Sequence, residues 1–439
     1  MTDAQTVEDR SPGLLKGVER AQREPAGRCN SLAPLIDVPT LERADRRQRA
    51  DAAGGVDGVT KEAYGRHLEA NLQDLHARLK DKVYRHQPIR RVPLPTAQGK
   101  TRPIGISACE AKVVQDAVRE VLEAMYAQDF LDGSHGFRPK RKAQDAVRTL
   151  KRIVEGGEGS WIDEADIGSF FDSVDRTELK KRLDIRVADG SLMRRIGKCV
   201  HVGVLDGETM VEPELGTAQG SVRSPLLGNV YLHSVLDLWF ETEVKPRLQG
   251  KATLRRYGDD FLIGFEREDE ARRVVAVLDK RMGRFGLALH PDKTRVLPFW
   301  RPPTSQQRGK GPATFDLLGC TFYWARTRKG HWRMACKTRR ASLRRAKMSL
   351  SDWGRRHRHW SIKDQHAALH RRLRGHCNSF GVSGNYNSMM RLAEATKRAW
   401  YKWRRRRSQR TRLHWERCTD MLRWWPLPRP RITVRIWDG

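Results

Sequence analysis

Hydrophobic and polar residues follow two different spacings along this chain. Between Leu254 and Phe265, apolar runs flank the tetrapeptide Tyr257-Gly-Asp-Asp260, which predicts two short strands joined by a tight turn. Upstream, Trp161–Asp166 alternates apolar and acidic residues, which predicts another strand. A cationic hairpin is predicted where Arg90–Pro95 is followed by Lys100–Ile106.

Other segments have the spacing of helices. In Tyr64–Leu79 the leucines recur every three or four residues, which places them on one face of a helix. Thr40 is the expected N-cap of a charged helix ending near Arg49. Further helices are predicted at Ala111–Tyr126, Ala143–Val154, Val222–Leu238, Arg339–Leu350, Asp364–His376 and Arg391–Arg407. Strands interspersed with helices predict an α/β (α+β) protein.

Asp259 and Asp260 place two like charges side by side at the predicted turn. Their repulsion is costly unless a cation is bound, and Asp166 ends a neighbouring strand with a third carboxylate. Such oxygen ligands suit Mg²⁺, and a pair of ions can activate a hydroxyl and stabilise a leaving pyrophosphate. We therefore expect two Mg²⁺ ions, with Mn²⁺ as the alternative. The competing interpretation is a solvated turn.

The chain has 439 residues and a formal charge of +32, which indicates a polyanionic partner. The charge is concentrated at one end, because residues 301–439 contain 35 Lys+Arg against 7 Asp+Glu. Ten of the thirteen tryptophans also lie there. Basic residues interleaved with aromatic residues are typical of a folded surface that binds nucleic acid, and a basic membrane-surface helix is the second interpretation.

The remaining composition favours an intracellular protein. The seven cysteines are scattered without a Cys-x-x-Cys pair, as expected for reduced thiols in the cytoplasm. His366 and His370, with His376-Cys377 nearby, allow a zinc site, but a basic helix face is the favoured interpretation. No apolar stretch approaches the length that spans a membrane, and the N-terminus lacks the pattern of a signal peptide.

The order of these segments resembles a known family. Asp166–Phe171 and Tyr257–Asp260 resemble motifs A and C of polymerase palms, and Gly216–His233 is similar to motif B of group II intron reverse transcriptases. Further similar blocks are Gly54–Thr60, Ser134–Lys140, Leu287–Thr294, Phe315–Phe322 and Leu373–Asn385. The resemblance covers roughly residues 45–405. It implies a right-hand polymerase fold with fingers, an antiparallel-sheet palm, a helical thumb and a basic helical maturase segment.

The resemblance also implies roles for individual residues. Asp166, Asp259 and Asp260 would be catalytic metal ligands, and Lys293 would protonate or stabilise pyrophosphate. The implied nucleotide-binding residues are Lys100, Arg102, Phe171, Gln219 and Gly220. The implied template or primer contacts are Lys112, Arg138, Leu318 and Gly319, and those to intron RNA are Trp400, Trp403, Arg404, Arg405, Arg406 and Arg407.

Phe171 would form a floor under the sugar that excludes a 2′-hydroxyl, so deoxynucleotides would be preferred. Alternation along a strand makes one of Phe170 and Phe171 a core residue, and we assign Phe170 to the core. The chain departs from the common family pattern at Thr96, Gly168, Arg223 and Gly258. A lysine is frequent at the position of Thr96, and Lys100 is assigned to take its place.

Five segments are expected. They are a disordered N-terminus (1–33), an N-terminal extension with fingers (34–155), a palm (156–326), a thumb with the maturase-specific segment (327–407) and a basic tail (408–439). That tail is too short for the endonuclease domain of some relatives.

The implied function is RNA-directed DNA synthesis from dNTPs on an RNA template with a DNA primer, together with binding of structured intron RNA for splicing and retrohoming. One alternative is a catalytically weak RNA-binding splicing factor. The other is an RNA-dependent RNA polymerase, in which Gly-Asp-Asp is frequent, although Phe171 argues against it. An intron-borne enzyme and a relative recruited to defence or repair would share these residues. Nothing in the pattern indicates an oligomeric state.

Overall fold

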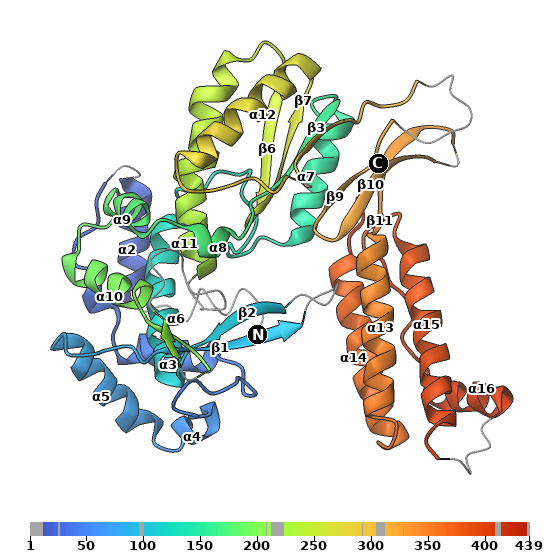
Figure 1. The fold of residues 1–439 in the computed structure, drawn as a ribbon, viewed down its shortest axis with the longest axis horizontal. Helices are drawn as coiled ribbons and strands as arrows, with labels where there is room; N and C mark the ends of the chain where they lie inside the picture. Colours follow the sequence, from blue (N-terminus) through green and yellow to red (C-terminus); the bar gives the residue numbers. More distant parts are fainter. Residues whose placement is uncertain are drawn as a thin grey trace.

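The computed structural model describes residues 12–24, 27–95, 101–207, 209–211, 224–291, 293–303, 312–327, 329–408 and 414–436. An antiparallel palm sheet has the strand order β6 (Ala252–Tyr257), β7 (Asp260–Phe265), β3 (Trp161–Asp166) and β8 (Arg295–Pro298). The β6–β7 hairpin is the predicted one, and Gly258 in its turn has a φ of 71°, which suits glycine. In Figure 1 this sheet lies above the fingers, and the thumb stands to the right.

Both faces of the palm sheet are covered, because side chains alternate along its strands. On one face, Ala165 and Ile263 join a core with helices α11 (Ser224–Leu232) and α12 (Glu268–Gly283). On the other face, Ile162 and Leu262 pack with helix α7 (Ala143–Glu155) and with aromatic residues of the thumb sheet. Beyond α11 the helix continues in two π-helical segments, His233–Leu238 and Phe240–Val244.

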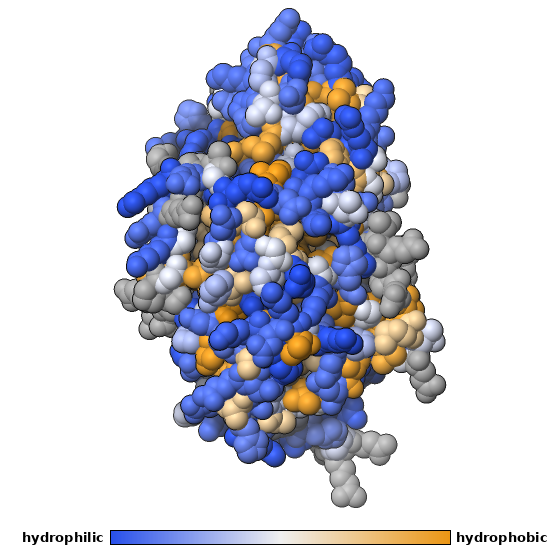
Figure 2. Space-filling view, turned by 90° about the vertical axis from the view of Figure 1, so that its left-hand side faces the viewer, coloured by the Kyte–Doolittle hydropathy of each residue, from blue (hydrophilic) through white to orange (hydrophobic). Residues whose placement is uncertain are grey.

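The fingers surround helix α6 (Cys109–Tyr126), which is buried along most of its length. Their sheet has the order β2 (Thr101–Ile106), β1 (Ile89–Pro95), β4 (Val204–Asp206) and β5 (Thr209–Val211). The other helices of the fingers are α3 (Val38–Arg47), α4 (Lys61–Gly65), α5 (Leu68–Lys80), α9 (Arg176–Asp184) and α10 (Gly190–Val200). The face that carries α9 and α10 is largely hydrophilic, with apolar patches between the polar side chains (Figure 2).

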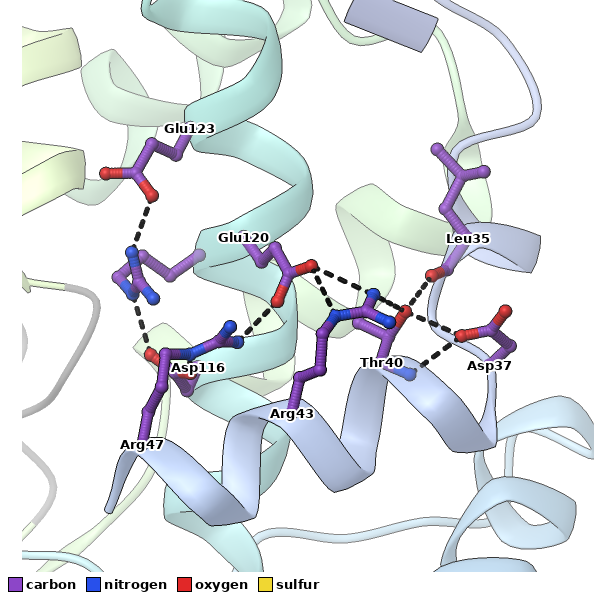
Figure 3. Close-up of polar contacts among 9 residues, drawn as sticks. Leu35, Asp37, Thr40, Arg43, Arg47, Asp116, Glu120 and Glu123 are labelled. Carbon is purple, nitrogen blue, oxygen red and sulfur yellow. Dashed lines mark hydrogen bonds and ion pairs between the residues drawn. The ribbon is translucent and has the colours of Figure 1, made fainter. Parts of the chain in front are cut away.

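An ion-pair network joins α3 to α6 (Figure 3). Arg43 binds Glu120 through Nε (3.1 Å) and Nη2 (2.9 Å), and Arg47 binds Asp116 (2.6 Å) as well as Glu120. The side chains of Asp116 and Glu120 are only 7% and 6% exposed, so these cations compensate carboxylates that are almost removed from water. The network fixes the crossing of the two helices.

The thumb begins with a sheet of β9 (Phe315–Leu317), β10 (Cys320–Arg326) and β11 (Trp332–Thr338). Helices α13 (Arg340–Arg356), α14 (Ile362–Phe380), α15 (Tyr386–Arg405) and α16 (Trp415–Trp424) follow. The β9–β10 turn is tied to the start of α13, because the N–H of Arg339 donates to the carbonyl of Gly319 (2.9 Å). The buried side chain of Asn385 accepts from the N–H of Thr338 (2.7 Å) and fixes α15 to the same point.

Two predictions about the N-terminal part are wrong. The segment 1–33 is not simply disordered, because Pro12–Arg23 forms helix α2 with Leu14 buried, and Cys29 forms a β-bridge with Val187. Thr40 does not cap α3. Asp37 caps it, and the side chain of Thr40 lies inside the first turn, where its hydroxyl donates to the carbonyl of Leu35 (2.9 Å).

Three other boundaries differ. The helix predicted for residues 64–79 is divided between α4 and α5. The thumb sheet crosses the boundary expected at residue 326, because β10 pairs with β11. The described part of 408–439 is not a tail, since it contains α16 and then returns to Gly381, whose carbonyl accepts from the N–H of Thr433 (2.7 Å), while Ile436 is buried.

Candidate active site

Asp166 and Asp260 lie side by side at one end of the two central strands of the palm sheet. They are register partners at the ends of β3 and β7, and Asp259 precedes Asp260 in the hairpin turn. Burial raises the pKa of Asp260 to about 7, with further contributions from a hydrogen bond to Asp166, the charge of Asp166 and the charge of Asp259. The site therefore has more negative charge than it can hold without a proton or another cation.

This donor set fits a divalent cation, because carboxylate oxygens that share a proton can exchange it for a metal ion. Within the described residues, no three His, Cys, Asp or Glu side chains are already arranged as a metal cluster. The ammonium group of Lys293 binds Oδ2 of Asp166. The predicted use of all three aspartates as ligands stays a prediction.

Lys293 reaches Asp166 because its segment extends the palm sheet. The N–H of Gly168 donates to the carbonyl of Ala288 (2.9 Å), and the N–H of His290 donates to the carbonyl of Asp166 (2.8 Å). The side chain of Lys293 is 52% exposed, whereas that of Asp166 is 15% exposed. The ammonium group therefore lies at the solvent side of the acids, where it can meet an incoming anion.

The β9–β10 turn lies across from the acids. A cavity of about 90 Å³ is lined by Asp166, Asp260 and Lys293 on one side and by Leu318, Gly319 and Arg339 on the other. Leu318 and Gly319 both have positive φ, 53° and 74°, so the turn is tight and presents its backbone to the cavity. The residues predicted to contact the primer end are thus within the same cavity as the predicted catalytic residues.

Phe170 and Phe171 lie in the short helix α8 (Phe170–Ser173), not in a strand. Phe170 is 3% exposed, so its assignment to the core is confirmed, but the strand alternation behind that assignment is wrong. Phe171 is half-buried against Phe170, with ring centroids 5.1 Å apart. Gly228 of α11 leaves room for both rings, because a Cβ there would lie 2.8 Å from Phe170 and 3.3 Å from Phe171.

Residues 92–322 match the family model described as "Reverse transcriptase (RNA-dependent DNA polymerase)", a span of more than half of the chain. The chain belongs to the reverse transcriptase family. This span contains both strands that carry the aspartates and the β9–β10 turn.

Several relatives of this reverse transcriptase are known by name. Protein YkfC of Escherichia coli (strain K12) is 33% identical over 313 residues, 63% of this chain and 81% of that protein. The group II intron-encoded protein LtrA of Lactococcus lactis subsp. cremoris is 35% identical over 187 residues, 41% of this chain and 31% of LtrA. A 91 kDa protein in the cob intron of Schizosaccharomyces pombe is 36% identical over 178 residues, 40% of this chain and 22% of that protein.

The predicted relationship to group II intron reverse transcriptases is confirmed by these relatives. The chain spans less than a third of the length of the two intron proteins. No helix in the part of the reverse transcriptase that the structure describes is both long enough and apolar enough to cross a membrane.

Some residues predicted to contact the template hydrogen-bond elsewhere in the fold and not to the aspartates of the candidate active site. The guanidinium of Arg138 donates to the carbonyls of Leu131 (2.6 Å) and Ser134 (2.9 Å), so it supports its own segment. Lys112 donates to the carbonyl of Ala53 (2.6 Å), which ties α6 to the glycine-rich turn. Their roles at the template stay predictions. Arg102 lies opposite Leu94 in the β1–β2 hairpin, and its side chain is outside the described part.

Lys100, Gln219 and Gly220 lie outside the described residues, as do Thr96 and Arg223. In the thumb, Trp400 is 3% exposed and its Nε1–H donates to Gln365 (2.7 Å), so it packs in the core and does not stack on bases. The indole N–H of Trp403 donates to the hydroxyl of Ser351 (3.0 Å).

Arg404 is half-buried at the end of α15, whereas Arg405, Arg406 and Arg407 are exposed there. A metal site at His366 and His370 is not formed in the described residues, and His366 Nε2 lies 2.9 Å from the carbonyl of Pro426.

A groove between α13 and α14 was not predicted from the sequence. Its volume is about 1280 Å³, and its lining includes the exposed residues Arg345, Arg356, Arg371 and Trp360. Charge and aromatic content alone indicated a nucleic-acid surface in this region, but the individual residues depend on how the two helices pack. Phe137 was also missed. It is 49% exposed beside the hairpin turn, with its ring centroid 6.0 Å from that of Tyr257.

Proposed function

We propose that the protein is an RNA-directed DNA polymerase of the group II intron type that adds dNTPs to a DNA primer on an RNA template. The supporting observation is the cavity that Asp166, Asp260 and Lys293 share with the Leu318-Gly319 turn. Nucleotidyl transfer needs acids and a primer end in the same place, and it depends mainly on positioning and charge neutralisation.

Asp166, Asp259 and Asp260 are the residues that would hold two divalent ions, Mg²⁺ or Mn²⁺. When bound, such ions activate an attacking hydroxyl and stabilise a leaving pyrophosphate. Lys293 would neutralise the leaving group or give it a proton, and its exposed ammonium group, which binds Asp166, supports this role. Phe171, which is half-buried against Phe170 and follows Asp166 by five residues, would form the floor under the sugar.

The test is extension of a labelled DNA primer on an RNA template with Mg²⁺ and dNTPs. Asp260→Asn and Asp259→Ala should lower the rate by more than about 100-fold, because each removes a charge that the transition state needs. Asp172→Asn, which alters an exposed carboxylate of α8, is the control and should retain the wild-type rate. If neither wild-type protein nor the variants extend the primer, while intron RNA still binds tightly, the result would support a catalytically weak splicing factor.

Substrate choice is tested with the same primer and template. Wild-type protein should prefer dNTPs to ribonucleotides, and Phe171→Ala should reduce that preference, because a smaller side chain leaves room for a 2′-hydroxyl. Ribonucleotides used as readily as dNTPs by the wild-type protein would instead favour an RNA-dependent RNA polymerase.

The same protein would bind structured intron RNA for splicing and retrohoming through its basic end. The α13–α14 groove supports this role, because its lining combines the exposed Trp360 with Arg345, Arg356 and Arg371. Arg356→Ala combined with Arg371→Ala should weaken RNA binding and lower the slope of log K against log salt by roughly 0.7–0.9 per lost phosphate contact. Arg272→Ala, on the exposed face of α12, should leave the slope unchanged.

A further inference from the structure

Arg256 lies one residue before the Tyr257-Gly-Asp-Asp260 turn, and its side chain is completely buried. A guanidinium group has five N–H donors, and each of those in Arg256 has an acceptor. Nε donates to Asp237 Oδ1 (2.9 Å), Nη2 to Asp237 Oδ2 (2.7 Å) and Ser134 Oγ (2.8 Å), and Nη1 to Asn229 Oδ1 (2.7 Å) and the carbonyl of Gly258 (3.0 Å).

These acceptors belong to four separate parts of the chain. Asp237 is in the π-helical segment behind the palm sheet, and Asn229 is in α11. Ser134 belongs to the block Ser134–Lys140, which resembles the family segment that supports the template. Gly258 is in the turn itself, directly before Asp259. One side chain therefore connects the template-supporting block and two helical segments to the turn that carries the acids.

The block and the turn are also in direct backbone contact. The N–H of Arg256 donates to the carbonyl of Gly133 (2.9 Å), and the N–H of His135 donates to the carbonyl of Arg256 (2.9 Å). A Cβ at Gly136 would lie 2.4 Å from the nitrogen of Gly258, so no side chain fits between them. A displacement of Gly136 toward the turn would therefore press directly on the backbone of Gly258.

We propose that Arg256 is a positioning residue that couples the template-supporting block to the catalytic turn. This inference rests on the proposed polymerase function. By holding the Gly258 carbonyl and the Ser134 hydroxyl with one rigid group, Arg256 makes the placement of Asp259 and Asp260 depend on the placement of the block. Lysine cannot replace it, because three donors on one nitrogen cannot span the carboxylate, the amide, the hydroxyl and the carbonyl at once.

The test compares Arg256→Lys and Ser134→Ala with wild-type protein in steady-state primer extension. Arg256→Lys should lower kcat by about 100-fold, the scale expected for a reacting group misplaced by about 1 Å. The KM for dNTP and the Kd for the RNA–DNA template–primer should each change by less than about threefold, because neither ligand touches the buried guanidinium. Ser134→Ala removes one acceptor and should lower kcat by about tenfold.

Three controls make the result decisive. Arg255→Lys, a matched change on the same strand, should leave kcat within about threefold of the wild-type value. Thermal unfolding should show that each variant is folded at the assay temperature. The double variant with both Arg256→Lys and Ser134→Ala should be no slower than Arg256→Lys alone, because both changes break the same connection.

Two outcomes would overturn the inference. One is a kcat for Arg256→Lys equal to that of an active wild-type enzyme. The other is a loss of rate that is accompanied by an equal loss of template–primer binding in both single variants, which would indicate general damage to the palm. Wild-type protein without any primer extension would count against the proposed function instead, so the two failures are distinguishable.

Discussion

Replacing Asp163 with asparagine should remove a pH dependence from the stability of the palm. Asp163 lies in the middle of β3 and is 0% exposed, and among the described residues neither of its carboxyl oxygens has a hydrogen-bond partner. Its neighbours in the sheet are Ile263 and Val296. Burial, followed by the charge of Glu164, raises the pKa of Asp163 to about 7.

Proton binding by Asp163 determines the sign and the size of this pH dependence of the unfolding free energy. The unfolded chain loses this proton near the ordinary aspartate pKa of 3.8, whereas the folded chain retains it until about pH 7. Between these values the folded state binds more protons, so the free energy of unfolding decreases as the pH rises. The difference of 3.2 between 7 and 3.8, at about 1.4 kcal/mol per pH unit, corresponds to roughly 4 kcal/mol. Roughly two-thirds of this loss falls between pH 5 and 8.

The assay is urea denaturation of wild-type protein and Asp163→Asn at pH 5, 6, 7 and 8, followed by circular dichroism. Asparagine has nearly the same shape but does not titrate, so the variant should gain about 3 kcal/mol relative to wild-type protein across this range. Asp172→Asn, which removes an exposed carboxylate, controls for the loss of one charge. Stability curves for wild-type protein and Asp163→Asn that run parallel from pH 5 to 8 would refute the reasoning.

Three further results are expected. Arg43→Ala should lower the unfolding free energy in urea by about 3 kcal/mol, because buried Glu120 loses a cation, whereas the exposed pair lost in Arg46→Ala should cost less than about 1 kcal/mol. Gly381→Ala should speed amide hydrogen exchange in residues 431–436, because its Cβ would lie 2.7 Å from a carbonyl of that segment. Lys293→Gln should lower kcat for primer extension by about 10²-fold without changing template binding.

Each of these results has a clear contrary outcome. Equal costs for Arg43→Ala and Arg46→Ala would show that burial of the α3–α6 network does not matter. Unchanged exchange in 431–436 would mean that the segment is held independently of Gly381. A wild-type kcat for Lys293→Gln would show that the ammonium group forms an ion pair with Asp166 but has no role at the leaving group.

Local sequence signals predicted the parts of the site that lie within one turn or one strand. The Tyr257-Gly-Asp-Asp260 hairpin was predictable because apolar runs and a glycine define it locally, and Asp166 ends a strand of clear alternation. The same signals failed at Phe170 and Phe171, where the strand gives way to a short helix.

Features that depend on distant packing were not predictable. The partners of Arg256 lie up to 122 residues away, so nothing in its neighbourhood indicated that it would be buried. Trp400 looked like a nucleic-acid contact because it is surrounded by basic residues, but a helix in a bundle also has an inner face. The return of residues 431–436 to Gly381 has no local signal at all, because it depends on the completed thumb.

The hydrogen bond between Arg339 and Gly319 has a mechanical consequence. It joins the start of the long thumb helix α13 to the tight turn that faces the acids. Asn385 holds the start of α15 at the same point, because its side chain accepts from the N–H of Thr338. A tilt of α13 would therefore be transmitted to this turn and would change its distance from Asp166 and Asp260 across the cavity.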